Sequence, residues 1–250
     1  MLSKQQIKFV QALSMKKYRQ LYGRFIAEGD KIVSEMLNTD YPVDAIYALP
    51  DWLEQHADEL KHNHSKIIVY EVNEAELKKI SCLETPNKVL AVCWISDSVP
   101  SHDMVSWSIC LVLDELKDPG NLGTIIRTAD WFDLPYIFCS PSCVDIYNPK
   151  TIQATMGSFL LVDVFRQPLP KLFNEYPEMP VYGALLNGQN LFTTSLTAPA
   201  FVVIGNEARG ISPEVLPYIQ HPITIPKLGK AESLNAAVAT GIICAWCSQR

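Results

Sequence analysis

The segment from Leu111 to Ala129 constrains the fold of this chain more than any other stretch. An apolar, β-branched run over residues 108–113 suits a buried strand of a parallel sheet. The sequence Asp118-Pro-Gly-Asn121 is typical of a tight turn, because Pro fixes φ while Gly and Asn tolerate positive φ. Residues 123–131 then predict a helix with an apolar side. This order places polar side chains at the carboxyl edge of a sheet, where open α/β proteins bind ligands.

Two polar residues of this segment are candidates for function. Asn121 lies in the predicted turn, and Arg127 lies in the helix that follows. We expect an arginine within an otherwise apolar helix to need a partner, because an unpaired buried charge is costly. An ion pair with Asp114 or Asp118 and a functional role explain Arg127 equally well on this evidence.

The rest of the chain alternates short strands and helices, and its 250 residues suffice for one large or two small domains with a proper core. A polar stretch that carries Pro100 separates a small α/β domain, residues 1–97, from an α/β domain over residues 106–250. The last predicted helix, residues 234–247, is apolar on all sides, and we expect it to be buried. The other expected strands are residues 25–29, 45–48, 66–70, 89–95, 136–139, 160–165, 181–186, 201–204 and 223–225, and the other expected helices are residues 30–37, 51–61, 73–80 and 150–159.

Several classes of protein are disfavoured by the sequence. No apolar run is long enough to span a bilayer, and residues 1–10 are too polar for a signal peptide, so we expect no membrane contact. Seven scattered cysteines without disulfide-framework spacing indicate reduced thiols and a cytoplasmic location. The Cys244-Ala-Trp-Cys247 pair lies in an apolar helix without a second ligand pair, which indicates core thiols and no metal site. The absence of a GxGxxG or P-loop motif argues against a dinucleotide dehydrogenase and an NTPase.

The charge of the chain is unevenly distributed. A net charge of −6 and an isoelectric point near 5.4 argue against nucleic-acid binding by overall electrostatics. Residues 1–24, however, contain basic side chains and no carboxylate. Such a cluster can bind phosphates locally, although a solvated helix face is the alternative. The candidate phosphate contacts are Lys16, Lys17, Arg19 and Arg24.

Two further polar clusters follow predicted strands in the second domain. In the first, a buried strand ends in Ile204-Gly205-Asn206-Glu207, and Gly210 turns the chain again; glycine at a strand edge lets a ligand approach the backbone. In the second, a loop from Ile225 through Gly229 and Ser233-Leu234 to Asn235 precedes the last helix, with Ser233 as its expected N-cap. Each polar residue alone could be a cap or a turn residue, but three clusters at strand ends in one domain favour a site.

Together the three clusters closely resemble the motifs of the SpoU/TrmH family of RNA ribose 2′-O-methyltransferases, within the SPOUT superfamily. The first motif corresponds to Asp118–Ala129, the second to Ile204–Gly210 and the third to Ile225–Asn235, in family order and spacing. Residues 1–95, with Lys16-Lys17-Tyr-Arg19 and Phe25-Ile-Ala-Glu-Gly29, resemble the small substrate-binding domain of members that modify ribosomal RNA. The chain departs from the family at Trp131-Phe132-Asp133, where members often have a glycine at the last position.

The resemblance implies a SPOUT domain with a trefoil knot near the C-terminus, a homodimer, S-adenosyl-L-methionine as cofactor and structured RNA as substrate, with ribosomal RNA ahead of transfer RNA. By motif match the catalytic positions are Asn121, Arg127, Glu207, Ser233 and Asn235. The positions that cradle the cofactor are Ile204, Gly205, Asn206, Gly210, Ile225, Gly229, Ser233 and Leu234.

The family's proposed base corresponds to Arg127, but a guanidinium normally stays protonated. We therefore assign Arg127 to binding the target phosphate and stabilising negative charge at the reacting oxygen, with Asn121 orienting it and Glu207 fixing that region. The alternatives are a transfer-RNA enzyme, a non-catalytic RNA-binding protein that retains the fold, and an unrelated α/β enzyme with a nucleotide cofactor.

Overall fold

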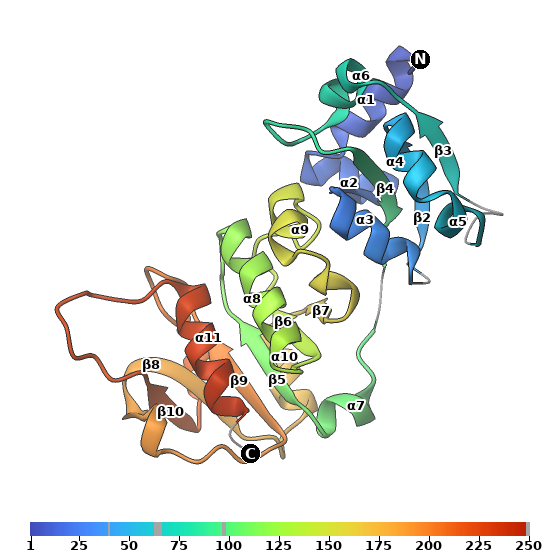
Figure 1. Cartoon of the computed structure of the whole chain (residues 1–250). Coiled ribbons are helices and arrows are strands. Elements are labelled where there is room, and N and C mark those ends of the chain that lie inside the picture. Colours follow the sequence, from blue (N-terminus) through green and yellow to red (C-terminus); the bar gives the residue numbers. More distant parts are fainter. Residues whose placement is uncertain (40, 63–66, 97–98, 249–250) are drawn as a thin grey trace. The chain divides into compact units, whose positions relative to one another are not determined.

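The computed structural model describes residues 1–39, 41–62, 67–96 and 99–248, and it confirms the predicted α/β class. The chain divides into two units (Figure 1). The first contains Met1–Asp97 and Tyr147–Leu160, and the second contains Ser98–Ile146 and Leu161–Arg250. The segment Tyr147–Leu160 thus groups with the first unit, although it lies inside the predicted domain over residues 106–250. No helix in the described part of the chain is long and apolar enough to cross a membrane.

The first unit is built on a mixed four-stranded sheet of order β1-β4-β2-β3. The strand β4 is antiparallel to both β1 and β2, while β2 and β3 are parallel. Its core includes Ile26 and Leu90 from the sheet and Val10 and Leu77 from the helices. The expected helix over residues 51–61 is two helices separated at His56. The elements are α1 (Lys4–Ala12), α2 (Lys16–Tyr22), β1 (Arg24–Glu28), α3 (Asp30–Leu37), β2 (Val43–Ala48), α4 (Pro50–Gln55), α5 (Ala57–His62), β3 (Ile68–Glu71), α6 (Glu74–Ile80), β4 (Val89–Trp94), α9 (Pro149–Thr155) and the 3₁₀ turn η1 (Ser158–Leu160).

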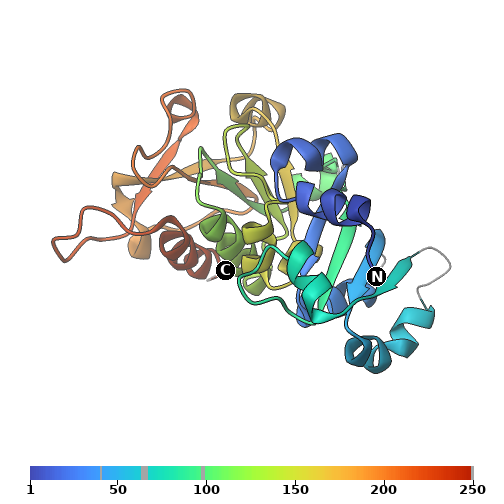
Figure 2. The same cartoon turned by 90° about the horizontal axis from the view of Figure 1, so that it is seen from above.

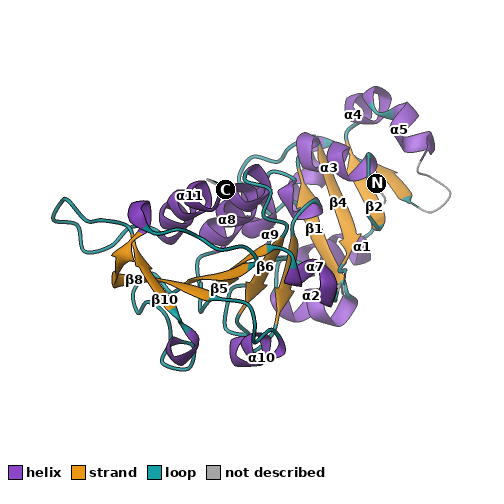
Figure 3. Cartoon of the chain, turned by 90° about the horizontal axis from the view of Figure 1, so that it is seen from below, coloured by secondary structure: helices purple, strands orange, loops and turns teal. Residues whose placement is uncertain are grey.

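The second unit is built on a six-stranded, all-parallel sheet of order β10-β8-β9-β5-β6-β7. Figure 3 shows α8 and α11 side by side on one face of this sheet and α10 on the other. The elements are α7 (His102–Ser106), β5 (Ile109–Leu113), α8 (Pro119–Trp131), β6 (Tyr136–Cys139), β7 (Asp163–Arg166), α10 (Leu169–Glu175), β8 (Val181–Asn190), η2 (Leu191–Thr193), β9 (Ala200–Ile204), η3 (Leu216–Tyr218), β10 (His221–Thr224) and α11 (Ala236–Cys247).

The central strands of the second unit are buried as the apolar runs predict. All five residues of β5 and of β9 are buried, and the two strands pair in parallel with Leu113 opposite Ile204. Their carboxyl ends therefore meet at one edge of the sheet, and the first and second motifs begin there.

The helix α8 begins earlier than predicted. Asp118 is its N-cap, Pro119 is its first residue, and Asn121 lies in its first turn instead of in a preceding loop. An Asp-Pro pair reads equally as a turn or as an N-cap followed by N1, and here it starts the helix. At the other end Asp133 adopts φ 54°, so the position where family members often have a glycine keeps a left-handed conformation.

The helix α11 is only partly covered within one chain, contrary to the expectation of full burial. Thr240, Ile243 and Cys244 are buried, but the Val238 side chain is 53% exposed. One apolar side of the helix thus faces outward.

Candidate active site

The structure joins the three motifs through one chain of side-chain hydrogen bonds. Asn121 Nδ2 donates to Glu207 Oε1 at 2.8 Å, and Asn235 Nδ2 donates to Asn121 Oδ1 at 2.9 Å. Asn121 comes from the first motif, Glu207 from the second and Asn235 from the third. Residues separated by as many as 114 positions in sequence are thereby brought together.

Helix capping fixes Asn121 and Asn235 in place. Asp118 Oδ1 accepts the Asn121 backbone N–H at 2.8 Å, which anchors the first turn of α8. Asn235 is the N-cap of α11, and its Oδ1 accepts the backbone N–H groups of Ala237 and Val238 at 2.9 and 3.3 Å. The prediction of Ser233 as the N-cap was therefore wrong. Ser233 is exposed and makes no hydrogen bond within the described residues.

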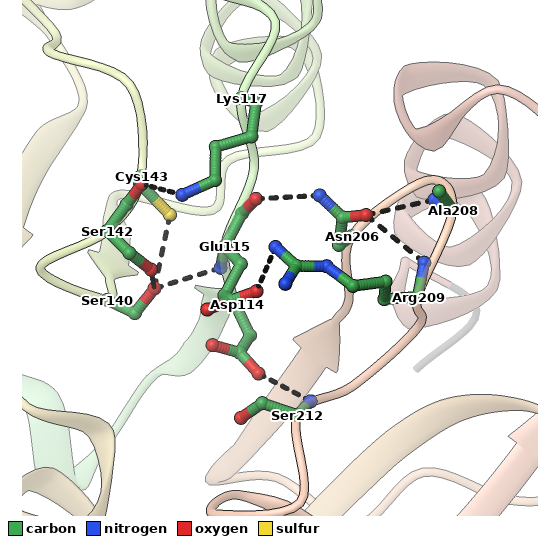
Figure 4. A network of polar contacts seen from close by, with 10 residues as sticks. All are labelled: Asp114, Glu115, Lys117, Ser140, Ser142, Cys143, Asn206, Ala208, Arg209 and Ser212. Carbon is green, nitrogen blue, oxygen red and sulfur yellow. Dashed lines mark hydrogen bonds and ion pairs between the residues drawn. The ribbon is translucent and has the colours of Figure 1, made fainter.

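The second motif forms a closed turn from Asn206 to Gly210. The backbone N–H and C=O groups of these two residues bond each other at 2.9 Å in both directions. The Asn206 side chain accepts the N–H groups of Ala208 and Arg209 at 3.0 and 3.1 Å and donates to the Glu115 carbonyl at 2.9 Å (Figure 4). Gly210 closes the turn at φ 68°, a conformation that suits glycine. The turn is thus rigidly held while it presents Glu207.

Gly205 is required by the packing of this turn. A Cβ atom there would lie 2.3–2.5 Å from the backbone of Gly210 and Ile211. The close approach that we predicted for a ligand is made by the chain's own backbone.

Arg127 is exposed, which corrects the premise that it needs a buried partner. Its side chain makes no hydrogen bond or ion pair with any other residue that the structure describes. Asp114, one of its two expected partners, is 2% exposed and accepts the Ser212 backbone N–H at 2.8 Å instead. The structural interpretation of Arg127 as half of an ion pair is therefore wrong, and its charge is available to a ligand.

The loop between β10 and α11 carries the third motif and projects from the second unit (Figure 2). Side chains of residues 227–235 are exposed, and Leu228 is 99% exposed. Within the described chain the backbone groups of residues 226–234 make no hydrogen bond. A Cβ atom at Gly229 would meet nothing within 4 Å. Free main-chain donors and acceptors beside exposed apolar side chains suit a ligand with a heteroaromatic ring.

The N-terminal basic cluster is only partly available to RNA. Lys16 and Lys17 are exposed at the start of α2. Arg19 is 2% exposed, and its Nη1 donates to the Leu13 and Ser14 carbonyls at 2.9 and 2.8 Å. The assignment of Arg19 as an RNA contact is therefore wrong, because its guanidinium satisfies carbonyls after the end of α1.

Arg24, the fourth member of the cluster, is tied down within the first unit. Its Nε bonds Asp44 Oδ2 at 3.0 Å, and its side chain is 13% exposed over the Trp94 ring. Its charge is already paired.

Sequence reasoning missed one pair at this edge of the sheet. Arg209 Nη2 lies 2.7 Å from Glu115 Oε2, and both residues flank motif positions. The sequence signal for Arg209 is its place in the glycine-bounded turn, whereas nothing in the sequence marks Glu115. The described residues contain no group of three His, Cys, Asp or Glu side chains that could hold a metal ion.

Comparison with known proteins identifies relatives for both parts of the chain. A model of the SpoU rRNA methylase family matches residues 108–245, and a model of the MRM3-like substrate binding domain matches residues 4–91. A Bacillus subtilis protein named 23S rRNA (guanosine(2553)-2′-O)-methyltransferase RlmP is 31% identical over 96% of this chain and 94% of its own length.

Solved structures agree in fold over nearly the whole chain. A TrmH-family protein from Porphyromonas gingivalis is 36% identical with a TM-score of 0.86, over 98% of each chain. An AdoMet-bound rRNA methyltransferase from Sinorhizobium meliloti is 28% identical with a TM-score of 0.85, over 98% of this chain and 95% of that one.

Proposed function

Because this chain belongs to the SpoU rRNA methylase family, we propose that it transfers a methyl group from S-adenosyl-L-methionine to a ribose 2′-hydroxyl of ribosomal RNA. The observation that carries the proposal is a pair of side-chain hydrogen bonds, from Asn235 to Asn121 and from Asn121 to Glu207. They lie at the start of α8, the helix that bears Arg127. The names of the Bacillus and Sinorhizobium relatives support ribosomal RNA ahead of transfer RNA.

The reaction needs alignment and charge stabilisation from the protein. A ribose 2′-hydroxyl is a weak nucleophile, and the bound cofactor supplies an electrophilic methyl group on a sulfonium. Arg127 binds the phosphate next to the target ribose and stabilises negative charge that develops on the 2′-oxygen. Asn121, Glu207 and Asn235 contact one another and act as positioning residues, because together they fix the start of α8. The exposed Ser233 hydroxyl is available to the substrate from the third motif.

The residues of the second and third motifs fit the cofactor. Backbone groups of the loop from Ile225 through Gly229 to Leu234 would hold it, since after residue 225 these groups make no hydrogen bond to any residue that the structure describes. The turn from Ile204 and Gly205 to Asn206 and Gly210 would form the neighbouring wall. The knotted crossing of the C-terminal chain remains a prediction from the family resemblance.

Two exposed lysines are the proposed RNA contacts of the first unit. Lys16 and Lys17 can each bind a phosphate and so offset the acidic net charge of the chain locally. The cytoplasmic location indicated by the thiols also remains a prediction.

The outward side of α11 supports a homodimer. Val238 is 53% exposed there, and Trp131 at the end of the neighbouring helix α8 is 84% exposed. Apolar side chains on adjacent helices are covered favourably by a second copy of the same surface.

The proposed activity is tested by incubating the protein with tritium-labelled cofactor and either ribosomal or transfer RNA transcribed in vitro. We expect label in ribosomal RNA. Label only in transfer RNA would support the transfer-RNA alternative. Binding of cofactor and RNA without methyl transfer would support the non-catalytic alternative.

Replacing Gly229 by valine is expected to remove cofactor binding without unfolding the protein. The new side chain meets no protein atom within 4 Å of its Cβ, but it would occupy space beside the free backbone of the loop. We expect the affinity for S-adenosyl-L-methionine to fall at least about tenfold, which corresponds to ~1.4 kcal/mol.

Calorimetric titration and a melting curve on the same sample check this prediction. Gly229→Ala is the matched control, because its single methyl group should be tolerated better. Wild-type affinity in Gly229→Val would contradict the placement of the cofactor at this loop.

A further inference from the structure

The turn from Asn206 to Gly210 carries two charged side chains, and only Glu207 has a role in the function proposed above. Glu207 contacts Asn121, whereas Arg209 forms an ion pair with Glu115 at 2.7 Å (Figure 4). The two backbone hydrogen bonds that close the turn, together with the Asn206 side chain, fix the backbone of Glu207 and Arg209. The Arg209 side chain therefore leaves from a fixed point next to the candidate site.

Glu115 is held in an unfavourable conformation. Its φ is 56°, which disfavours a residue with a Cβ atom and which glycine adopts freely. Its N–H donates to Ser140 Oγ at 2.9 Å and its carbonyl accepts from Asn206 Nδ2 at 2.9 Å, so the backbone is fixed on both sides. A glycine would meet the same backbone demands with less strain. The Glu115 side chain therefore lowers the stability of the fold relative to glycine. Its carboxylate forms the ion pair with Arg209.

Stability does not account for the ion pair. The Arg209 side chain is 66% exposed and that of Glu115 is 28% exposed. Ion pairs with this degree of solvent contact contribute little to folding. A strained carboxylate that adds little stability points to a function of the arginine that it holds.

The guanidinium of Arg209 is suited to bind an anion. Its side chain is 66% exposed and makes no hydrogen bond or ion pair with any residue other than Glu115 in the described part of the chain, so some of its five N–H donors remain for a ligand. A planar guanidinium binds phosphate through two parallel hydrogen bonds. Lys117, whose Nζ donates to the Ser142 carbonyl at 2.6 Å, adds a second exposed cation at the same sheet edge.

We propose that Arg209 binds a backbone phosphate of the RNA substrate, and that Glu115 is a positioning residue that orients Arg209 for this contact. The inference rests on the proposed function, since it names a second phosphate contact for the same RNA. It gives the acidic chain a cation next to the reacting ribose in addition to Arg127.

The test uses the full chain with Arg209→Gln, and Lys171→Gln as the matched control. Lys171 is an exposed cation on α10, on the opposite face of the sheet from α8 and α11. Filter binding of ribosomal RNA is measured over a series of salt concentrations. We expect Arg209→Gln to weaken binding about tenfold and to reduce the slope of log K against log salt by about 0.7 to 0.9, as for one lost phosphate contact. Lys171→Gln should leave both unchanged.

Glu115→Gln separates positioning from charge. This variant keeps the Arg209 cation, so we expect the salt slope of the wild type but a KM for RNA raised severalfold, with kcat nearly unchanged. Its melting temperature should stay near that of the wild type, because the amide keeps the size of the carboxylate.

Three results would overturn the inference. Wild-type RNA affinity and salt slope in Arg209→Gln would show that this cation contacts no phosphate. If Arg209→Gln lost affinity for S-adenosyl-L-methionine in calorimetry, Arg209 would belong to the cofactor site instead. An unchanged KM in Glu115→Gln would remove its positioning role. Failure of the wild type to methylate any RNA would contradict the proposed function, while the change in salt slope would still report the phosphate contact.

Discussion

Replacing Arg127 by alanine is expected to abolish methyl transfer while the melting temperature and the affinity for S-adenosyl-L-methionine stay close to those of the wild type. The Arg127 side chain is exposed and has no polar partner in the described chain, so its removal should break no side-chain hydrogen bond or ion pair. The loss of a preorganised charge at the reacting oxygen typically costs about 10²–10³ in rate. Arg127→Lys should fail nearly as badly, because an ammonium lacks the planar fork that binds two oxygens together.

Arg166→Ala is the matched control for this prediction. Arg166 donates from Nη1 to the Pro141 and Cys143 carbonyls, both at 2.8 Å, so its guanidinium holds a loop. We expect that variant to melt earlier and to keep its rate per folded molecule. Melting curves and single-turnover rates on both variants distinguish a catalytic role of Arg127 from a structural one. A destabilised Arg127→Ala with a normal rate per folded molecule would contradict the catalytic assignment.

Replacing Gly205 by alanine is expected to have the largest effect on stability, and to remove activity with it. The new methyl group would lie 2.3–2.5 Å from backbone atoms of Gly210 and Ile211, and backbone cannot move aside as a flexible side chain can. The turn must then open, which releases Glu207 from Asn121. We expect the free energy of unfolding to fall by about 3 kcal/mol, the upper part of the range for overpacked sites.

Gly210→Ala tests whether the effect of Gly205→Ala comes from the clash. A Cβ atom at Gly210 would meet nothing within 4 Å, and only its φ of 68° disfavours alanine. We expect that variant to lose about 1 kcal/mol, the cost of a left-handed conformation for a residue with a Cβ atom. Urea denaturation of the two variants measures the difference. Equal losses would contradict the steric explanation.

The buried strands and most of the site could be predicted from the sequence. The apolar runs that became β5 and β9 are short and rich in β-branched residues, which favours strands buried inside a sheet that is covered on both faces. Their polar ends had to meet at one edge. Asn121, Glu207 and Asn235 were therefore predictable as neighbours, and the structure places them within hydrogen-bond distance.

The remaining features depend on geometry that sequence patterns do not encode. The pair Asp118-Pro119 fits a turn and a helix start equally well, and tertiary contacts of the first turn decide between them. A basic cluster does not reveal that Arg19 folds back onto backbone carbonyls. The left-handed conformation of Glu115 is imposed by its neighbours, Ser140 and Asn206, which come from distant parts of the chain.

Methyl transfer to a ribose 2′-hydroxyl is tested most directly by identifying the methylated atom in the product. Ribosomal RNA methylated by the purified protein is digested to nucleosides and resolved by mass spectrometry. We expect the added methyl group in a single 2′-O-methylated nucleoside. The reason is that Arg127 is proposed to stabilise charge on the ribose 2′-oxygen, and the hydrogen-bonded residues at the start of α8 are proposed to position it. A methyl group on a base, with no gain in 2′-O-methylated nucleoside, would contradict the account.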